Sequence, residues 1–461
     1  MDQSLTLEEP IRSPAAKRHV KPPAGEETLE HRNIRQGEFW RAIPKYRDVD
    51  VPTFLDHVWQ GQQSVKTPLE LLETIRDLVP STFFEDAREG FRRAPMAVRV
   101  SPYVIASIDW SRPYEDPIRT QFIPVASRML PDHPKLTLDS LHEQEDAPVA
   151  GLVHRYADRA LFLPVNVCPV YCRFCTRSYA VGLDTETVDK APLATTPKAW
   201  QDAFNYIASR PEIEDVVISG GDAYQLAPKS IASIGDALLA IPHVQRLRYA
   251  TKGLAVLPCK ILTDPAWVDA LTGVVERGRR AGKEVVIHTH FNHPAEVSWI
   301  TQQAVRLLTE RGVTIRNQSV LIRNVNDDPR TMALLVKRLG WLGMQPYYVY
   351  VHDLVKGVED LRTSVQTAID LEKSVRGVTS GFNTPAFVCD APGGGGKRDV
   401  HSYEYYDREN GIVVYTAPSV KPGRSFLYFD PVDTLGAAAQ DRWRSPRMQD
   451  EMIEQALARA R

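Results

Sequence analysis

The sequence predicts an α/β fold, a partial (βα)6 barrel of the TIM-like type with a helical N-terminal region and a C-terminal extension. Two observations predict it. After residue 146, short β-rich runs alternate with longer runs that have helical periodicity. Polar motifs follow five of the six predicted strands, as they do where loops gather at the carboxyl ends of barrel strands. Right-handed crossovers between parallel strands are the simplest arrangement, although the pattern does not exclude a closed eight-stranded barrel.

The predicted elements follow one another along the chain. Strands are expected at 160–166, 215–219, 247–250, 284–289, 313–319 and 346–350. Helices are expected between them at 197–210, 229–240, 264–281, 295–311 and 328–342. Upstream, Thr67 followed by proline and an amphipathic run predicts a helix that is capped by this threonine.

The chain divides into four predicted regions. Residues 1–32 combine several prolines with charged residues and lack periodicity, so we expect a disordered or loosely draped arm. Residues 33–146 are expected to be helical, 147–378 to form the barrel, and 379–461 to form a C-terminal region with subunit contacts of a homo-oligomer. A chain of 461 residues is long enough for one large barrel with additions.

Composition excludes several classes of partner. The formal net charge is −2, with 56 basic against 58 acidic residues, so no nucleic acid is expected. The mean hydropathy is −0.30, and no apolar run approaches the ~20 residues that span a bilayer, so we expect no membrane association. Five cysteines and no apolar leader at the start of the sequence indicate a reducing compartment, and a cytoplasmic protein is expected.

Three cysteines directly follow the first predicted strand. Cys168, Cys172 and Cys175 form a C-x3-C-x2-C array. Three thiolates at this spacing can hold three irons of a 4Fe–4S cluster and leave the fourth iron open to a small molecule, which is typical of radical S-adenosylmethionine (SAM) enzymes. Zinc is the weaker alternative, because Cys259 and Cys389 have no partner at zinc spacing. An odd, sparse set of cysteines also argues against disulfides.

Two glycine-containing motifs and a charged segment are further candidates. A Ser-Gly-Gly-Asp motif at 219–222 would let main-chain groups approach a cofactor, although such a motif is often only a turn. Four glycines precede Lys397, and we expect them to present its amine on a pliable arm for a Schiff base with an aldehyde cofactor. A phosphate-binding P-loop is excluded by Arg398 after the lysine, and a plain linker is the alternative. Two arginines and a tyrosine at 154–159 suit a phosphate monoester.

Five motifs resemble the lysine 2,3-aminomutase family in order and spacing. They are the segments YCRFCTR at 171–177, SGGD at 219–222, THFNHP at 289–294, NQSVL at 317–321 and DAPGGGGK at 390–397. The similarity runs from about residue 33 to past residue 397. This resemblance implies a radical SAM barrel and an isomerase that uses pyridoxal 5′-phosphate (PLP) and moves an α-amino group to the β-carbon, with L-lysine as the expected substrate.

The resemblance also implies a role for each matching residue. The three cysteines would hold the 4Fe–4S cluster, whose open iron would bind SAM. Lys397 would bind PLP covalently as the catalytic lysine, and its phosphate would lie against Arg155, Tyr156 and Arg159. Arg177 would bind the substrate carboxylate, and Asp353 and Asp390 would bind the distal ammonium. The SAM site would be lined by Gly220, Gly221, Asp222, His288 and Gln318.

Some features depart from the family pattern and leave alternatives open. Ser178 stands where a second arginine is common, and Thr251-Lys252-Gly253 replaces a Ser-Arg-Thr-like turn near SAM. Cysteines that form a zinc site in some relatives have no counterpart near Asp328 or the C-terminus, so no zinc is expected. An arginine or glutamate aminomutase or a modifier of a protein lysine would share this scaffold, although two aspartates disfavour glutamate. A non-catalytic iron–sulfur electron-transfer protein is the alternative from another class. The enzyme would need an external one-electron reductant of the flavodoxin or ferredoxin type.

Overall fold

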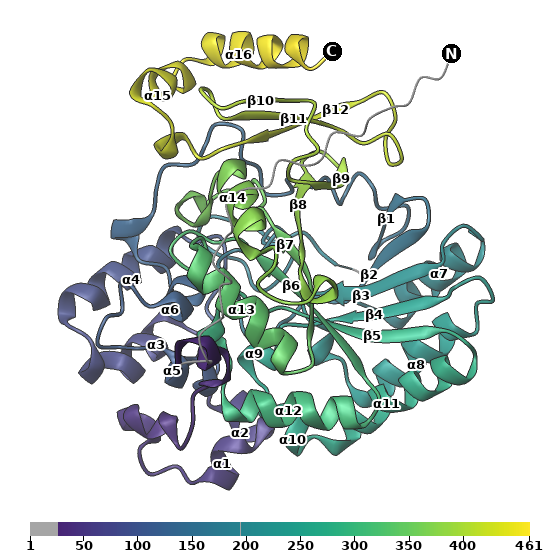
Figure 1. Ribbon diagram of the computed structural model, residues 1–461. Coiled ribbons are helices and arrows are strands. Elements are labelled where there is room, and N and C mark those ends of the chain that lie inside the picture. The colour runs from purple at the N-terminus through teal and green to yellow at the C-terminus, as the bar shows by residue number, and fades with distance from the viewer. Residues whose placement is uncertain (1–25, 194) are drawn as a thin grey trace, which may run out of the picture.

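The computed structural model describes residues 26–193 and 195–461 of the chain (Figure 1). Most of the predicted N-terminal arm therefore lies outside the described residues. Its last part, Glu26–Arg32, forms the 3-10 helix η1, which contacts α13 (Pro329–Trp341). The guanidinium of Arg338 on α13 donates to the carbonyl oxygens of Glu30, His31 and Asn33 and so fixes this segment.

The N-terminal region is helical, as predicted. It contains α1 (Val51–Leu55), α2 (His57–Gln62), α3 (Pro68–Ile75), α4 (Ser81–Arg93), α5 (Pro102–Ser107) and α6 (Pro117–Phe122), joined by short 3-10 turns. The predicted cap of α3 is confirmed, because the hydroxyl of Thr67 accepts a hydrogen bond from the Glu70 amide at 3.2 Å.

A nine-stranded sheet forms the centre of the molecule, with its strands in sequence order. They are β1 (Leu152–Tyr156), β2 (Arg159–Val165), β3 (Asp215–Gly220), β4 (Arg246–Ala250), β5 (Glu284–Thr289), β6 (Thr314–Val320), β7 (Gln345–Tyr350), β8 (Ala386–Ala391) and β9 (Gly396–Asp399). From β2 to β8 all neighbours are parallel, while β1 and β9 are antiparallel at the two edges. The predicted α/β fold and all six predicted strands are confirmed.

Three strands of this sheet were missed by the sequence analysis. No strand was predicted before β2, where residues 154–159 were interpreted as a phosphate-binding segment, but Leu152–Tyr156 forms β1 and only Ala157 and Asp158 turn. The strands β8 and β9 extend the sheet past residue 378, into the region that was expected to be separate from the barrel. Because β1 and β9 lie at opposite ends of the strand order, the sheet is an open barrel.

Helices cover the outer face of the sheet (Figure 1). They are α7 (Pro197–Ala208), α8 (Pro228–Leu239), α9 (Gly253–Val256), α10 (Cys259–Thr263), α11 (Pro265–Arg280), α12 (Trp299–Glu310), α13 and α14 (Val365–Val375). The helix expected at 295–311 is interrupted, because the Ser298 hydroxyl accepts from the amides of Ile300 and Thr301 and starts α12 there. Among the helices of the described residues, none combines the length and the apolar character needed to cross a membrane.

The C-terminal region forms a small layer of its own at one end of the barrel (Figure 1). It consists of the antiparallel sheet β10 (Tyr405–Asp407), β11 (Ile412–Thr416) and β12 (Ser425–Phe429), followed by α15 (Ala437–Trp443) and α16 (Pro446–Arg459). β12 contacts β8, so this layer lies beside the hairpin that carries Lys397.

Candidate active site

An interior cavity of about 270 Å³ is enclosed by the barrel strands and the loops that follow them. The predicted site residues that line it are Arg155, Tyr156, Arg159, Arg177, His288, Gln318, Asp353, Asp390 and Lys397. Of the other predicted site residues in the described chain, the three cysteines, Gly220, Gly221 and Asp222 do not line this cavity. The structure thus brings most of the predicted residues together around one space.

Lys397 lies on the β8–β9 hairpin directly opposite Asp390. Its ammonium donates to the Asp390 carboxylate at 3.0 Å and lies 5.5 Å from the ring centre of Tyr350. Burial alone would lower the pKa of Lys397, but Asp390 and the nearby tyrosines outweigh burial and raise the pKa well above its ordinary value. The lysine is therefore held as a cation while Asp390 is its partner.

The glycine run forms a tight turn, so the expected pliable arm is wrong. Gly393, Gly394 and Gly396 have φ between +74° and +82°, a region that other residues avoid. A Cβ on Gly395 would lie 2.6 Å from the Phe426 ring, and one on Gly396 would lie 2.8 Å from the Tyr156 hydroxyl oxygen. That hydroxyl accepts a hydrogen bond from the Lys397 amide at 2.9 Å. The glycines let the hairpin fit closely against β1 and β12, and this fixes Lys397.

Replacing Gly396 with alanine is expected to lower the free energy of unfolding by about 2 kcal/mol or more, because a left-handed backbone and a steric contact both oppose the new Cβ. Gly393→Ala is the matched control, since Gly393 has a φ of +78° but no atom within 4 Å of the added Cβ. Chemical denaturation of the three proteins measures the difference. Equal losses for the two variants would show that the contact with Tyr156 is unimportant.

Asp353 lies in the loop after β7 and faces the same cavity. Burial is the largest cause that raises the pKa of Asp353, to about 7, and the charge of Asp390 is the second. The Thr176 hydroxyl donates a hydrogen bond to the Asp353 carboxylate. One oxygen of Asp390 has no hydrogen-bond partner among the described residues. The buried carboxylate of Asp390 and the half-buried carboxylate of Asp353 form a pocket that favours a cationic group.

Arg155, Tyr156 and Arg159 lie on the hairpin formed by β1 and β2. The guanidinium of Arg155 donates to Asp146 at 2.8 Å and lies 3.9 Å from Asp390. The guanidinium of Arg159 stacks over the Tyr156 ring at 4.4 Å and binds the adjacent Asp158, which is largely exposed. Two cations beside Lys397 give this end of the cavity the charge that a phosphate group requires.

Arg177 is held by Glu143, a residue that the sequence analysis missed. Two nitrogens of Arg177 donate to the two carboxylate oxygens of Glu143 at 2.8 and 2.7 Å, and the Tyr179 hydroxyl donates to the same carboxylate at 3.1 Å. Glu143 is buried and lines the cavity. It stands in an acidic run before β1 that looks like exposed sequence, so its local pattern carries no signal for this role.

The three cysteines lie close enough to influence one another, and each of them is half-buried. Burial raises the pKa of each, that of Cys172 to about 12, so ionised sulfurs here need a positive partner. In the described ranges no three His, Cys, Asp or Glu side chains are arranged to hold a single metal ion. A 4Fe–4S cluster instead places each cysteine on a different iron. Three neighbouring thiols that need a positive partner when ionised fit such a cluster.

The Ser-Gly-Gly-Asp motif at the end of β3 packs against the start of the cysteine loop. The amides of Gly221 and Asp222 donate to the carbonyls of Val165 and Val167 at 2.6 and 3.0 Å. Gly220 has a φ of +99°, and a Cβ there would lie 2.1 Å from the Val165 oxygen. The two glycines are thus required by the close approach of the β2 and β3 ends. Buried Asp222 accepts from the Lys252 amide at 2.8 Å.

Aromatic side chains from β7 form one wall of the cavity, and the sequence analysis did not assign them a role. A register shift between β6 and β7 places both Tyr347 and Tyr348 on the cavity, where Tyr350 donates to Gln318 at 2.8 Å. The ring centre of His288 lies 5.4 Å from that of Tyr347. Burial lowers the pKa of His288 to about 3, so the imidazole is neutral. The tyrosine-rich run at 346–350 was the available signal.

The chain is similar in sequence to known aminomutases. A family described as lysine-2,3-aminomutase matches residues 372–406, which include the β8–β9 hairpin. The chain is 37% identical to L-lysine 2,3-aminomutase of Clostridium subterminale over 78% of this chain and 81% of the relative. It is 32% identical to glutamate 2,3-aminomutase of Clostridioides difficile over 65% of this chain and 66% of the relative. Among solved structures, a radical SAM methyltransferase from Sphaerobacter thermophilus covers 52% of this chain and 68% of its own, with a TM-score of 0.32 and 16% identity, too low to support an argument.

A barrel whose cavity is lined by Lys397 and two aspartates, together with these relatives, defines an enzyme of the isomerase class. The chain belongs to the lysine 2,3-aminomutase family and is an aminomutase. Membership in this family implies SAM and an iron–sulfur cluster as cofactors.

Proposed function

We propose that the protein is an L-lysine 2,3-aminomutase that uses SAM, a 4Fe–4S cluster and PLP. The observation that carries this proposal is that Lys397, the carboxylates of Asp353 and Asp390, and Arg177 line one cavity. An amine for PLP, an anionic site for a distal ammonium and a cation for a carboxylate are the three features that such a substrate requires.

The chain supplies a distinct set of residues for each cofactor. Cys168, Cys172 and Cys175 would hold the cluster, and Gly220, Gly221, Asp222, His288 and Gln318 would line the SAM site. Lys397 would bind PLP, with Arg155, Tyr156 and Arg159 near its phosphate. When bound, these cofactors supply the radical and carbonyl chemistry that moves an amino group between adjacent carbons. The protein orients the substrate and keeps water out of the cavity.

Ion pairs within the site would rearrange when substrate binds. In this structure Lys397 forms an ion pair with Asp390, and Arg177 forms one with Glu143. When Lys397 is used for PLP, Asp390 becomes free to join Asp353 in binding the substrate ammonium. Arg177 keeps one nitrogen outside its pair with Glu143, and this nitrogen can donate to the substrate carboxylate.

Charge favours lysine over glutamate. A glutamate side chain would place a carboxylate beside Asp353 and Asp390, and like charges in a buried site repel strongly. Arginine has a suitable cation but needs a deeper pocket. The proposed substrate is thus a small amino acid. The proposal also includes an external one-electron reductant of the flavodoxin or ferredoxin type. It places the protein in the cytoplasm as a homo-oligomer.

A substrate panel tests this proposal. Anaerobic protein reconstituted with iron, sulfide, SAM and PLP is reduced and given lysine, arginine, glutamate or alanine, and β-amino acid products are separated by chiral chromatography. The expected kcat/KM for lysine exceeds that for glutamate and alanine by at least about tenfold, since a charged hydrogen bond contributes about 1.5–3 kcal/mol. A preference for arginine would keep the aminomutase reaction and change the substrate. A preference for glutamate would contradict the acidic pocket.

A further inference from the structure

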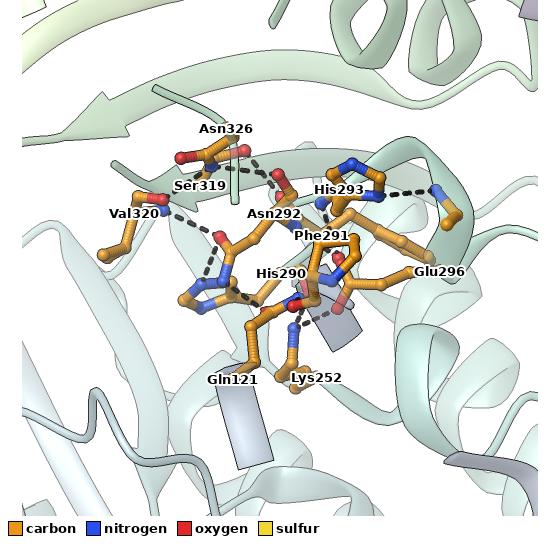
Figure 2. A network of polar contacts seen from close by, with 12 residues as sticks. Gln121, Lys252, His290, Phe291, Asn292, His293, Glu296, Ser319, Val320 and Asn326 are labelled. Carbon is orange, nitrogen blue, oxygen red and sulfur yellow. Dashed lines mark hydrogen bonds and ion pairs between the residues drawn. The ribbon is translucent and has the colours of Figure 1, made fainter. Parts of the chain in front are cut away.

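Lys252 is buried and takes part in a network of polar contacts with His290 and Glu296 (Figure 2). It donates to a carboxylate oxygen of Glu296 at 2.8 Å and to the carbonyl oxygen of His290 at 2.9 Å. The side chain of Lys252 is 9% exposed and that of Glu296 is 2% exposed. A buried ion pair of this kind is costly to desolvate, so its charges act in a medium that screens them weakly.

The ammonium of Lys252 lies against the loop that carries the cysteines. It is 5.7 Å from the ring centres of Phe122 and of Phe174, and Phe174 stands between Cys172 and Cys175 in the chain. Cys172 packs against the buried apolar cluster that contains Phe174. The positive end of the ion pair is therefore the end that faces the cysteine loop.

The ion pair is fixed at both ends. The Lys252 amide donates to Asp222. The second carboxylate oxygen of Glu296 accepts from the amides of Asn292 and His293 (Figure 2). The Asn292 side chain in turn donates to Gln121 on α6 at 2.9 Å. A cation held by this many buried contacts has one position and does not swing away when the charge beside it changes.

We propose that the Lys252–Glu296 ion pair sets the reduction potential of the iron–sulfur cluster, with the Lys252 ammonium stabilising the reduced form. Reduction adds one electron, donated by the external reductant, and so adds negative charge at the cysteine loop. A fixed cation nearby stabilises that charge and raises the midpoint potential. The inference rests on the proposed function, because it requires the cluster at the three cysteines.

The test is a redox titration of the anaerobic reconstituted protein, followed by electron paramagnetic resonance of the reduced cluster. Lys252→Met removes the cation and is expected to lower the ratio of reduced to oxidised cluster at least tenfold at a fixed potential, about 59 mV for one electron. Glu296→Gln removes the anion and is expected to shift the midpoint upward. Lys252→Arg keeps the charge and is expected to stay close to the wild type.

Lys260 offers a matched control. It is also a lysine paired with a carboxylate, that of Asp264, and its ammonium lies 5.9 and 5.8 Å from the ring centres of Tyr224 and Trp267. Its charge is not among the largest influences on the pKa of the three cysteine thiols. Lys260→Met is therefore expected to leave the midpoint unchanged.

Opposite shifts for Lys252→Met and Glu296→Gln, with no shift for Lys260→Met, would support the proposal. Unchanged midpoints in both Lys252→Met and Glu296→Gln, or an equal shift in Lys260→Met, would overturn it. If Lys252→Met does not retain a cluster, the midpoint potential of Glu296→Gln decides: an upward shift supports the proposal, and no shift or a downward shift overturns it. A wild-type protein without any cluster signal would instead contradict the proposed function, so the two failures are distinguishable.

Discussion

Lys397→Ala is expected to lose amino migration by roughly 1,000-fold or more, because no other lysine lines the cavity in the described part of the chain and a covalent anchor for PLP is lost. Borohydride reduction of the wild type, followed by peptide mass spectrometry, is expected to place the pyridoxyl group on the peptide that contains Lys397. The variant should give no such peptide.

Lys397→Arg separates the chemistry from the ion pair. Arginine keeps a positive charge beside Asp390 but forms no imine under these conditions, so we expect it to fold like the wild type and to be inactive. Lys260→Ala, which changes a lysine outside the cavity, is expected to retain activity. A pyridoxyl group found on Lys252 or Lys260 would contradict the assignment of Lys397.

Asp353→Asn is expected to weaken lysine binding and to stabilise the fold at the same time. Loss of the carboxylate removes a charged hydrogen bond to the substrate, and KM is expected to rise about 10- to 100-fold. The asparagine oxygen can still accept from the Thr176 hydroxyl that donates to Asp353. Steady-state kinetics at pH 8 measures the first effect.

The effect on stability follows from the pKa of Asp353, which is raised to about 7. In an unfolded chain this carboxyl ionises near pH 4. Between about pH 4 and 7 the folded protein keeps a proton on Asp353 that the unfolded chain has lost. The free energy of unfolding therefore falls as the pH rises through that window. Asp353→Asn avoids a buried charge and is expected to raise the free energy of unfolding at pH 8 by about 1–3 kcal/mol, with no gain near pH 4.

Thermal or chemical unfolding of the substrate-free protein at pH 4 and pH 8 measures this effect. Asp441→Asn is the control, because Asp441 is exposed on α15 and its replacement should change stability by less than about 0.5 kcal/mol. If Asp353→Asn instead destabilises the protein at pH 8, the contacts of the Asp353 carboxylate offset the cost of burying its charge, which would contradict this expectation.

Alternation of β and helical patterns was sufficient to predict β2 to β7, because buried parallel strands are continuous apolar runs with helices between them. It was insufficient for β1, where Arg155 and Tyr156 face the cavity and give the strand a polar sequence. It also failed for β9, where glycine and charged residues take part in the sheet through hairpin pairing with β8. Strands that line a polar site lack the pattern that identifies buried strands.

The residues of the site that carry rare motifs could be predicted, and those that act through tertiary contacts could not. Lys397 and the cysteines stand in motifs that resemble the lysine 2,3-aminomutase family in order and spacing. Glu143 pairs with Arg177 across a separation of 34 residues, and Glu296 reaches Lys252 across 44. Such pairs form only when the barrel brings loops together, so no local sequence pattern indicates them.

The protein is proposed to move the α-amino group of lysine to its β-carbon. Isotope tracing tests this reaction most directly. Reconstituted, reduced protein is incubated with SAM, PLP and L-lysine that carries ¹⁵N only in the α-amino group, and the products are analysed by mass spectrometry and NMR. We predict β-lysine with ¹⁵N bound to the β-carbon and no labelled ammonium in solution. Failure to form β-lysine, or release of the label as ammonium, would contradict the account.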